Sequence, residues 1–128
     1  MTKNILIRIE NDVAPFCAER NLPYAAIRFK PPPDTETLPP EYLVYDVISD
    51  PDVTFFSGSR KDTNYRIQFD YVVDADADYK LTTVPDELET WLMSRGYKPQ
   101  GNARYEYDKE VNKTYYQKDY MIRIKRSD

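Results

Sequence analysis

Apolar and polar residues alternate in two stretches near the middle of the chain. These stretches run from Tyr42 to Ile48 and from Tyr65 to Val73, and a polar segment of about sixteen residues separates them. A period of two is typical of strands that bury one face and expose the other. The pattern therefore predicts two paired strands, which form a hairpin with an unusually long loop.

A different periodicity precedes this hairpin. Apolar residues between Ile5 and Cys17 recur at three- and four-residue spacing, which predicts an amphipathic helix from Lys3 to Glu19. Pro15 lies inside it, and an interior proline lacks the amide hydrogen and crowds the preceding turn, so we expect the helix to kink or end near Ala14. A first short strand from Tyr24 to Phe29 follows.

The segment that leads to a second predicted helix can be interpreted in two ways. Three aspartates at alternate positions between Asp74 and Asp78 could cap one helix that continues to Gly96, a residue typical of helix C-termini. Alternatively, Thr83 and Asp86 form a capping pair that starts the main helix at Val84, and the aspartates belong to a separate turn. The aspartates lack the glycine and glutamate that complete a calcium loop, so we expect no metal there.

The last third of the chain returns to strand patterns. Residues Arg104 to Tyr107 and Tyr115 to Lys125 flank a polar turn and predict a second hairpin. The order of elements predicts an α+β fold with an antiparallel or mixed sheet of four to five strands, flanked by two helices on one face. A long hairpin loop and a proline-rich arm complete a single domain over residues 1–128.

The composition argues against most enzyme classes. The chain has no histidine and one cysteine, so it lacks the commonest general base and metal ligand, and we expect no catalytic activity, no cofactor and no metal. Cys17 lies on the apolar stripe and is expected in the core. Asp46, Asp70 and Tyr71 could form a hydrolytic site only in principle, because no spacing specifies one.

The charge balance and hydropathy limit the partners. The net charge of −4 argues against specific nucleic-acid binding. No apolar run approaches the roughly 20 residues that a membrane span needs, so we expect no membrane contact.

Seven segments, spread over most of the chain, carry a resemblance to a known family. In their order along the chain they resemble the tail terminator, or tail completion, proteins of long-tailed bacteriophages. The segments are the N-terminal helix, the proline stretch that leads into Pro39 to Tyr45, the loop around Ser57 to Ser59, Tyr65 to Tyr71, the helix through Leu88 and Trp91, Gly96 with Tyr97, and Tyr105 to Asp108 with its hairpin.

The resemblance implies a structural virion protein. Such subunits, typically six, form a ring at the head-proximal end of the tail tube, where the ring ends tube polymerisation and provides the surface for head–tail joining. The implied partners are further copies of the chain, the tail tube protein and a head completion or connector protein. The implied location is the virion, after synthesis in the cytoplasm of the bacterial host.

Three groups of residues are candidates for these contacts. In the loop from Asp50 to Asn64, adjacent aromatic rings beside basic residues predict a partner loop, and the prolines between Pro31 and Pro40 predict a stiff, extended arm that is either a linker or a contact. Acidic residues near the second helix and basic residues of the closing hairpin are predicted to meet between neighbouring subunits. The groups are Asp52, Val53, Phe55, Phe56, Arg60 and Lys61 (partner loop); Pro31, Pro32, Pro33, Pro39 and Pro40 (proline arm); and Asp76, Asp78, Asp86, Glu87, Lys113, Lys118, Arg123 and Lys125 (subunit interface).

Two alternatives remain open at this point. One is another neck or head–tail connector subunit, which would share the small size and the ring assembly. The other is a small cytoplasmic module that binds a peptide at its sheet edge or proline arm.

Overall fold

A computed structural model of the protein describes residues 2–26, 39–48, 52–56 and 60–125. The first helix, α1, spans Thr2–Arg20 and confirms the predicted helix, but it does not end near Ala14. Pro15 is solvent-exposed, so its missing hydrogen bond leaves the Asn11 carbonyl on the wet side of the helix. Because the apolar stripe through Val13 and Phe16 stays buried, packing keeps the helix intact across the proline.

The sheet is mixed, and the α+β class predicted from the sequence is confirmed. Its strand order is β1-β2-β4-β6-β5, in which β1 runs parallel to β2 and the other neighbours are antiparallel. The part of the predicted first strand after Ala26 lies outside the described residues. The strands are β1 (Tyr24–Ala26), β2 (Glu41–Val47), β4 (Arg60–Asp74), β5 (Lys98–Asp108) and β6 (Lys113–Lys125).

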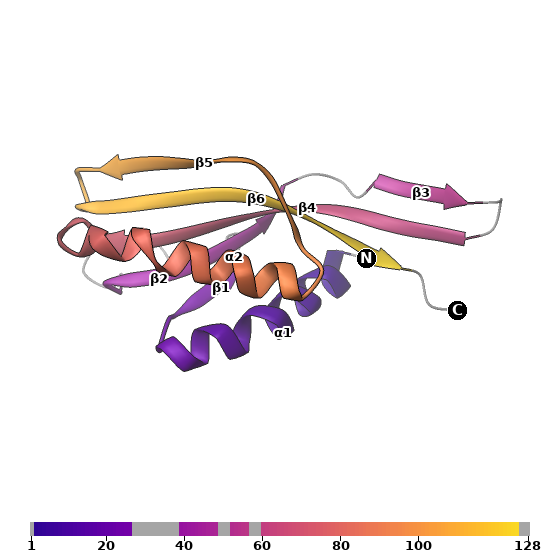
Figure 1. The fold of residues 1–128 in the computed structure, drawn as a ribbon, viewed down its shortest axis with the longest axis horizontal. Coiled ribbons are helices and arrows are strands. Elements are labelled where there is room, and N and C mark those ends of the chain that lie inside the picture. Colours follow the sequence, from indigo (N-terminus) through magenta and orange to yellow (C-terminus); the bar gives the residue numbers. More distant parts are fainter. Residues whose placement is uncertain (1, 27–38, 49–51, 57–59, 126–128) are drawn as a thin grey trace.

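The long polar loop predicted between the two central strands is partly wrong, because it contains a further strand. Strand β3 (Asp52–Phe56) pairs antiparallel with the first residues of β4, which begins at Arg60 rather than at Tyr65. The β-branched and aromatic residues of this segment favour extended backbone, and their polar neighbours concealed that preference in the sequence. The β3–β4 hairpin extends past both helices (Figure 1).

The second of the two interpretations for the next segment is confirmed. A 3-10 helix, η2 (Ala75–Thr82), is followed by a separate helix, α2 (Val84–Ser94). The predicted capping pair is wrong, however, because the Thr83 side chain makes no capping hydrogen bond to α2 and instead donates to the Lys80 carbonyl. Pro85 lies in the first turn of α2, where a helix needs no amide hydrogen, so it is accommodated without strain.

The end of α2 confirms the predicted glycine cap. Gly96 has a φ of 96°, its amide donates to the Met93 carbonyl at 3.1 Å, and the Tyr97 amide donates to the Leu92 carbonyl at 3.0 Å. This pair of bonds is a Schellman motif, which requires a left-handed residue at the glycine position. The motif turns the chain back onto the sheet and buries the Tyr97 ring.

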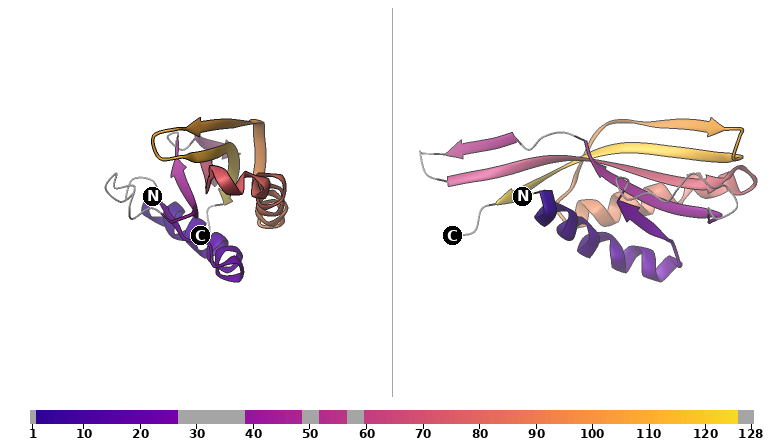
Figure 2. Two further views of the ribbon diagram at one scale, coloured as in Figure 1. Left: turned by 90° about the vertical axis from the view of Figure 1, so that its left-hand side faces the viewer. Right: turned by 180° about the vertical axis from the view of Figure 1, so that it is seen from behind.

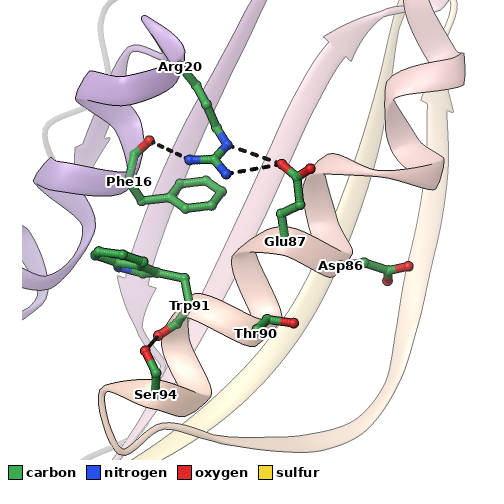
Figure 3. Close-up of a pocket in the computed structure, with 7 residues that line it drawn as sticks. All are labelled: Phe16, Arg20, Asp86, Glu87, Thr90, Trp91 and Ser94. Atoms are coloured by element: carbon green, nitrogen blue, oxygen red, sulfur yellow. Dashed lines mark hydrogen bonds and ion pairs between the residues drawn. The ribbon is translucent and has the colours of Figure 1, made fainter.

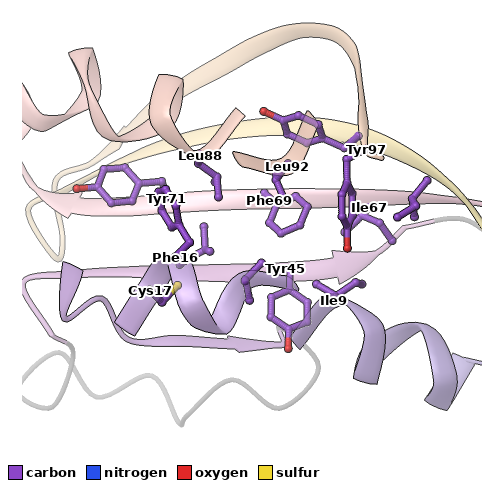
Figure 4. Close-up of a cluster of buried hydrophobic side chains, with 14 of the residues drawn as sticks. Ile9, Phe16, Cys17, Tyr45, Ile67, Phe69, Tyr71, Leu88, Leu92 and Tyr97 are labelled. Atoms are coloured by element: carbon purple, nitrogen blue, oxygen red, sulfur yellow. The ribbon is translucent and has the colours of Figure 1, made fainter. Parts of the chain in front are cut away.

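The hydrophobic core lies between the two helices and one face of the sheet (Figure 2). Aromatic rings dominate it: Phe69 of β4 makes edge contacts with Tyr97 and Tyr120 at centroid distances of 6.1 and 5.6 Å. Cys17 is buried in this core, as predicted (Figure 4). The strand residues that alternate with these rings therefore form the opposite face of the sheet, which no described helix covers.

Candidate functional site

The predicted partner loop is the β3–β4 hairpin, which extends beyond the helices, and residues Asp62 to Asn64 of its second strand also pair with β6. In its register, Phe55 lies opposite Lys61 and Phe56 lies opposite Arg60. Strand β3 lies beyond the helix layer (Figures 1 and 2).

A second surface lies between α1 and α2, where an open groove of about 470 Å³ runs between the two helices (Figure 3). The groove is lined by Phe16, Arg20, Asp86, Glu87, Thr90, Trp91 and Ser94.

Two aromatic rings lie beneath this groove, and one of them, Phe16, is buried. The rings of Phe16 and Trp91 lie with centroids 6.2 Å apart, and the Trp91 indole nitrogen donates to the Asp12 carbonyl at 2.7 Å. The guanidinium carbon of Arg20 lies 3.8 Å from the Phe16 ring centroid, and that of Arg95 lies 4.3 Å from the Trp91 ring centroid. Both rings are thus held in place by contacts within the chain.

The end of the groove nearest the start of α2 is acidic. Glu87 accepts two hydrogen bonds from Arg20, at 3.1 and 3.2 Å, so its charge is largely balanced. Asp86 is exposed and forms no ion pair with any described residue. In the preceding turn, Asp76 and Asp78 are exposed as well. This end of the helix layer therefore presents carboxylates that the rest of the described chain does not neutralise.

The basic half of the predicted subunit interface is largely used inside the chain. Lys113 is only 4% exposed, forms an ion pair with Asp74 and donates to the Pro39 carbonyl at 2.9 Å. Lys118 pairs with Glu89 at 2.7 Å. The sequence predicted both lysines as surface charges, whereas the strand register places Lys113 opposite Asp74 of β4, and Lys118 lies beside Glu89 of α2. Arg123 is exposed, and Lys125 is the last residue of β6.

Only the end of the proline arm belongs to the described residues. Pro31, Pro32 and Pro33 lie outside them. The Pro39 carbonyl accepts the Lys113 hydrogen bond, and the Pro40 carbonyl accepts one from the Asp74 amide at 2.8 Å. The arm therefore enters β2 from a point that is fixed against β4 and β6.

The uncovered face of the sheet carries a ladder of polar side chains. Asp119 accepts from Arg66 at 3.1 Å and from Arg104 at 3.3 Å. Asp70 accepts from the amides of Gln68 and Gln117, each at 3.0 Å. Burial raises the pKa of the Asp70 carboxyl. Because these groups satisfy one another across three strands, the face is internally paired.

The three residues considered for hydrolysis do not form a site. Asp70 and Tyr71 are consecutive on β4 and so face opposite sides of the sheet, and the Tyr71 hydroxyl donates to Glu41 at 2.5 Å. Within the described part of the chain, no three His, Cys, Asp or Glu residues are placed to hold a metal ion. No helix among the described residues is long and apolar enough to cross a membrane.

Sequence reasoning missed the groove and the contribution of α1 to it. One signal was present: Arg20 follows Phe16 by four residues and Trp91 follows Glu87 by four, so each pair shares one helix face. The side-by-side arrangement of the two helices, which brings these faces together, is a tertiary feature that neither spacing contains.

The chain was also compared with known proteins. No family model matches it, and no curated protein sequence matches it.

Proposed function

We propose that this protein is the tail terminator of a long-tailed bacteriophage: a structural subunit that forms a ring at the head-proximal end of the tail tube, ends tube polymerisation and provides the surface for head–tail joining. The observation that carries the proposal is that one subunit has two regions of unlike composition. The β3–β4 hairpin contains Phe55, Phe56, Arg60 and Lys61 in its sequence, whereas η2 and α2 expose the carboxylates of Asp76, Asp78 and Asp86.

Unlike surfaces support ring assembly for a geometric reason. A contact between two different patches repeats head to tail, and it closes into a ring when the rotation between neighbours divides a full turn. The hairpin continues directly into β4 and extends away from the helices, so it is not directed at the groove of its own subunit (Figure 1). In the proposed virion, six copies form the ring, which contacts the tail tube protein on one side and a head completion or connector protein on the other.

The experiment that tests this function is deletion of the gene in the phage or prophage that encodes it, followed by negative-stain electron microscopy of the lysate. Filled heads beside unattached tails of irregular or excessive length are expected, because an uncapped tube continues to polymerise and cannot join a head. Heads that have lost their DNA would assign the protein to the connector instead. Normal virions would refute a structural role.

A peptide-binding module is the second candidate, and the free edge of the sheet favours it. Strand β5 pairs only with β6 among the described strands, and its side chains include the exposed rings of Tyr105 and Tyr107. An extended peptide could add to such an edge through backbone hydrogen bonds. A stable complex with a host protein in cells that contain no virions would support this candidate over the terminator.

A further inference from the structure

We propose that two copies of this chain associate through the free edge of β5, with the two strands antiparallel and related by a two-fold axis at Tyr105. The occupant of the edge is thus the same strand of a second copy. In such a contact both subunits use the same surface, whereas the ring of the proposed function repeats a contact between unlike surfaces. The inference therefore goes beyond the proposed function and does not depend on it.

The free edge is the second half of β5. This strand is last in the strand order, and it pairs only with β6 among the described strands. Its first half is irregular, because the register with β6 shifts between Gln100 and Arg104, and Gly101 has a φ of 72°. Pro99 also has no amide hydrogen to donate there. From Arg104 to Asp108 the pairing with β6 is continuous, so this segment presents regular backbone to a further strand.

The side chains of this segment are accessible on both faces of the sheet. Four consecutive residues, Arg104 to Tyr107, are exposed, and successive residues of a strand point to opposite faces. Tyr105 is 62% exposed although its ring makes an edge contact with Tyr116 at a centroid distance of 5.3 Å. Glu106 forms no ion pair with any described residue. A second strand at this edge would cover the ring and pair the carboxylate.

The charges of the segment select one antiparallel register. When Tyr105 lies opposite its symmetry mate, Arg104 of each strand lies opposite Glu106 of the other, which gives two pairs of opposite charge. Moving the axis by one residue in either direction would place two Glu106 or two Arg104 side chains directly opposite each other, and like charges there are destabilising. The order Arg-Tyr-Glu is therefore complementary to itself about a two-fold axis at the tyrosine.

Arg104 can make the new ion pair without losing its contacts inside the chain. Its Nη2 donates to Asp119 at 3.3 Å and to Gln68 at 3.4 Å, both long for such bonds. A guanidinium carries five N–H donors, and Nε and Nη1 of Arg104 make no hydrogen bond to any described residue. These two nitrogens are thus available to the Glu106 carboxylate of the second copy.

Aromatic contact across the axis provides the adhesion. In the strand register Tyr71 lies opposite Tyr116, and Tyr116 lies opposite Tyr105, so three tyrosines form a row from the centre of the sheet to its edge. The proposed pairing joins the rows of two subunits at their exposed Tyr105 rings. A contact of one short strand is smaller than the roughly 1,200–2,000 Å² of stable interfaces, so we expect a reversible, concentration-dependent dimer.

Disulfide cross-linking of the purified full chain tests the contact and its register. Tyr105→Cys places a thiol at the axis, where directly opposed Cβ atoms lie about 4.5–5.5 Å apart. Tyr107→Cys is the matched control, because Tyr107 is also an exposed tyrosine on the same face of β5. In the proposed register it lies four residues, or roughly 13 Å, from its mate along the strand. Cys17 can stay, since it is buried and burial raises its pKa to about 12.

The expected result is a covalent dimer on a non-reducing gel after mild oxidation of Tyr105→Cys, and a monomer for Tyr107→Cys. No covalent dimer with Tyr105→Cys, or equal amounts with both variants, would overturn the proposal. A chain that gives no such dimer would leave the edge of β5 to the peptide-binding module. Gene deletion tests the terminator function separately, because its phenotype does not depend on this contact.

Charge reversal provides a second, independent test. Glu106→Arg would place it opposite Arg104 of the other copy at two positions, so it should raise the dimer dissociation constant by roughly tenfold in sedimentation equilibrium. Glu110→Arg makes the same change in net charge in the exposed turn between β5 and β6, and it should leave the constant unchanged. An unchanged constant for Glu106→Arg, or an equal rise for both variants, would show that the proposed register is wrong.

Discussion

Two aspartates on the uncovered sheet face show how the identity of the hydrogen-bond donor decides the role of a buried carboxylate. Asp70 and Asp119 are both 5% exposed, yet Asp119 accepts from two guanidinium groups whereas Asp70 accepts from two neutral amides. Burial raises the pKa of Asp70, so its charged form is disfavoured in the folded state. Asp119 instead neutralises Arg66 and Arg104.

The two aspartates should therefore respond differently to the same substitution. Asp119→Asn should lower the free energy of unfolding by about 1–2 kcal/mol, because two arginines lose a charged acceptor while both remain partly hydrated. Asp70→Asn should change it by less than about 1 kcal/mol, since the remaining oxygen still accepts from Gln68 and the Gln117 amide can turn to accept from the new amide group. Urea unfolding at neutral pH measures both, and equal losses would contradict the distinction.

Among the elements, α1 shows that packing overrides a local rule. Pro15 breaks the hydrogen-bond pattern of a helix, yet α1 continues to Arg20 because its apolar stripe is buried on both sides of the proline. Pro15→Ala should raise the free energy of unfolding by about 1–2 kcal/mol. The substitution restores one hydrogen bond to the Asn11 carbonyl, and part of this gain is offset because the unfolded chain becomes more flexible without the proline. Urea unfolding with circular dichroism measures the change. A loss of stability would mean that the proline ring itself makes favourable contacts.

The β3–β4 hairpin is the element whose role is best separated from folding. Phe55→Ser with Phe56→Ser should leave the thermal unfolding temperature within a few degrees of the wild type, because the hairpin projects beyond the helix layer (Figure 1). The same variant should impair ring assembly and joining to tube or head, scored as free tails in lysates. Tyr105→Ser with Tyr107→Ser is the matched control, because it also removes two exposed rings, and it should assemble normally. Loss of folding in the phenylalanine variant would show instead that the rings belong to the core.

Most elements could be predicted from the sequence because their signals are local. Period-two alternation located β2, the second half of β4 and β6, and Gly96 located the end of α2. Strand β3 was missed because its few apolar residues lie among polar ones. Its pairing with β4 is a contact of the folded chain that the local sequence pattern does not show. The groove was missed for the same reason: it exists only where two distant helices pack side by side.

At the scale of the whole molecule, the abundance of buried tyrosine couples folding to alkaline pH. Burial raises the pKa of Tyr42, Tyr45 and Tyr116 to about 12, and it raises the pKa of Tyr71, Tyr97 and Tyr120 further. In the unfolded chain a tyrosine ionises near its ordinary pKa of 10.0. Above that pH the unfolded state binds fewer protons than the folded state, so the free energy of unfolding falls as the pH rises. The stabilisation is complete below about pH 10 and is lost progressively toward pH 12.

We therefore expect cooperative alkaline unfolding rather than gradual titration. Far-ultraviolet circular dichroism, followed from pH 9 upward in small steps, should change in one transition between about pH 10 and 12, and the phenolate absorbance of the buried tyrosines should appear in that same transition, because these tyrosines ionise only when the core opens. Tyr116→Phe keeps the ring in the core but removes one ionisable group, so at equal starting stability it should move the transition to higher pH. Phenolate absorbance that reaches the value for all 12 tyrosines while the dichroism stays native would mean that the buried rings ionise in the folded protein, and that the tyrosine core does not set the alkaline limit.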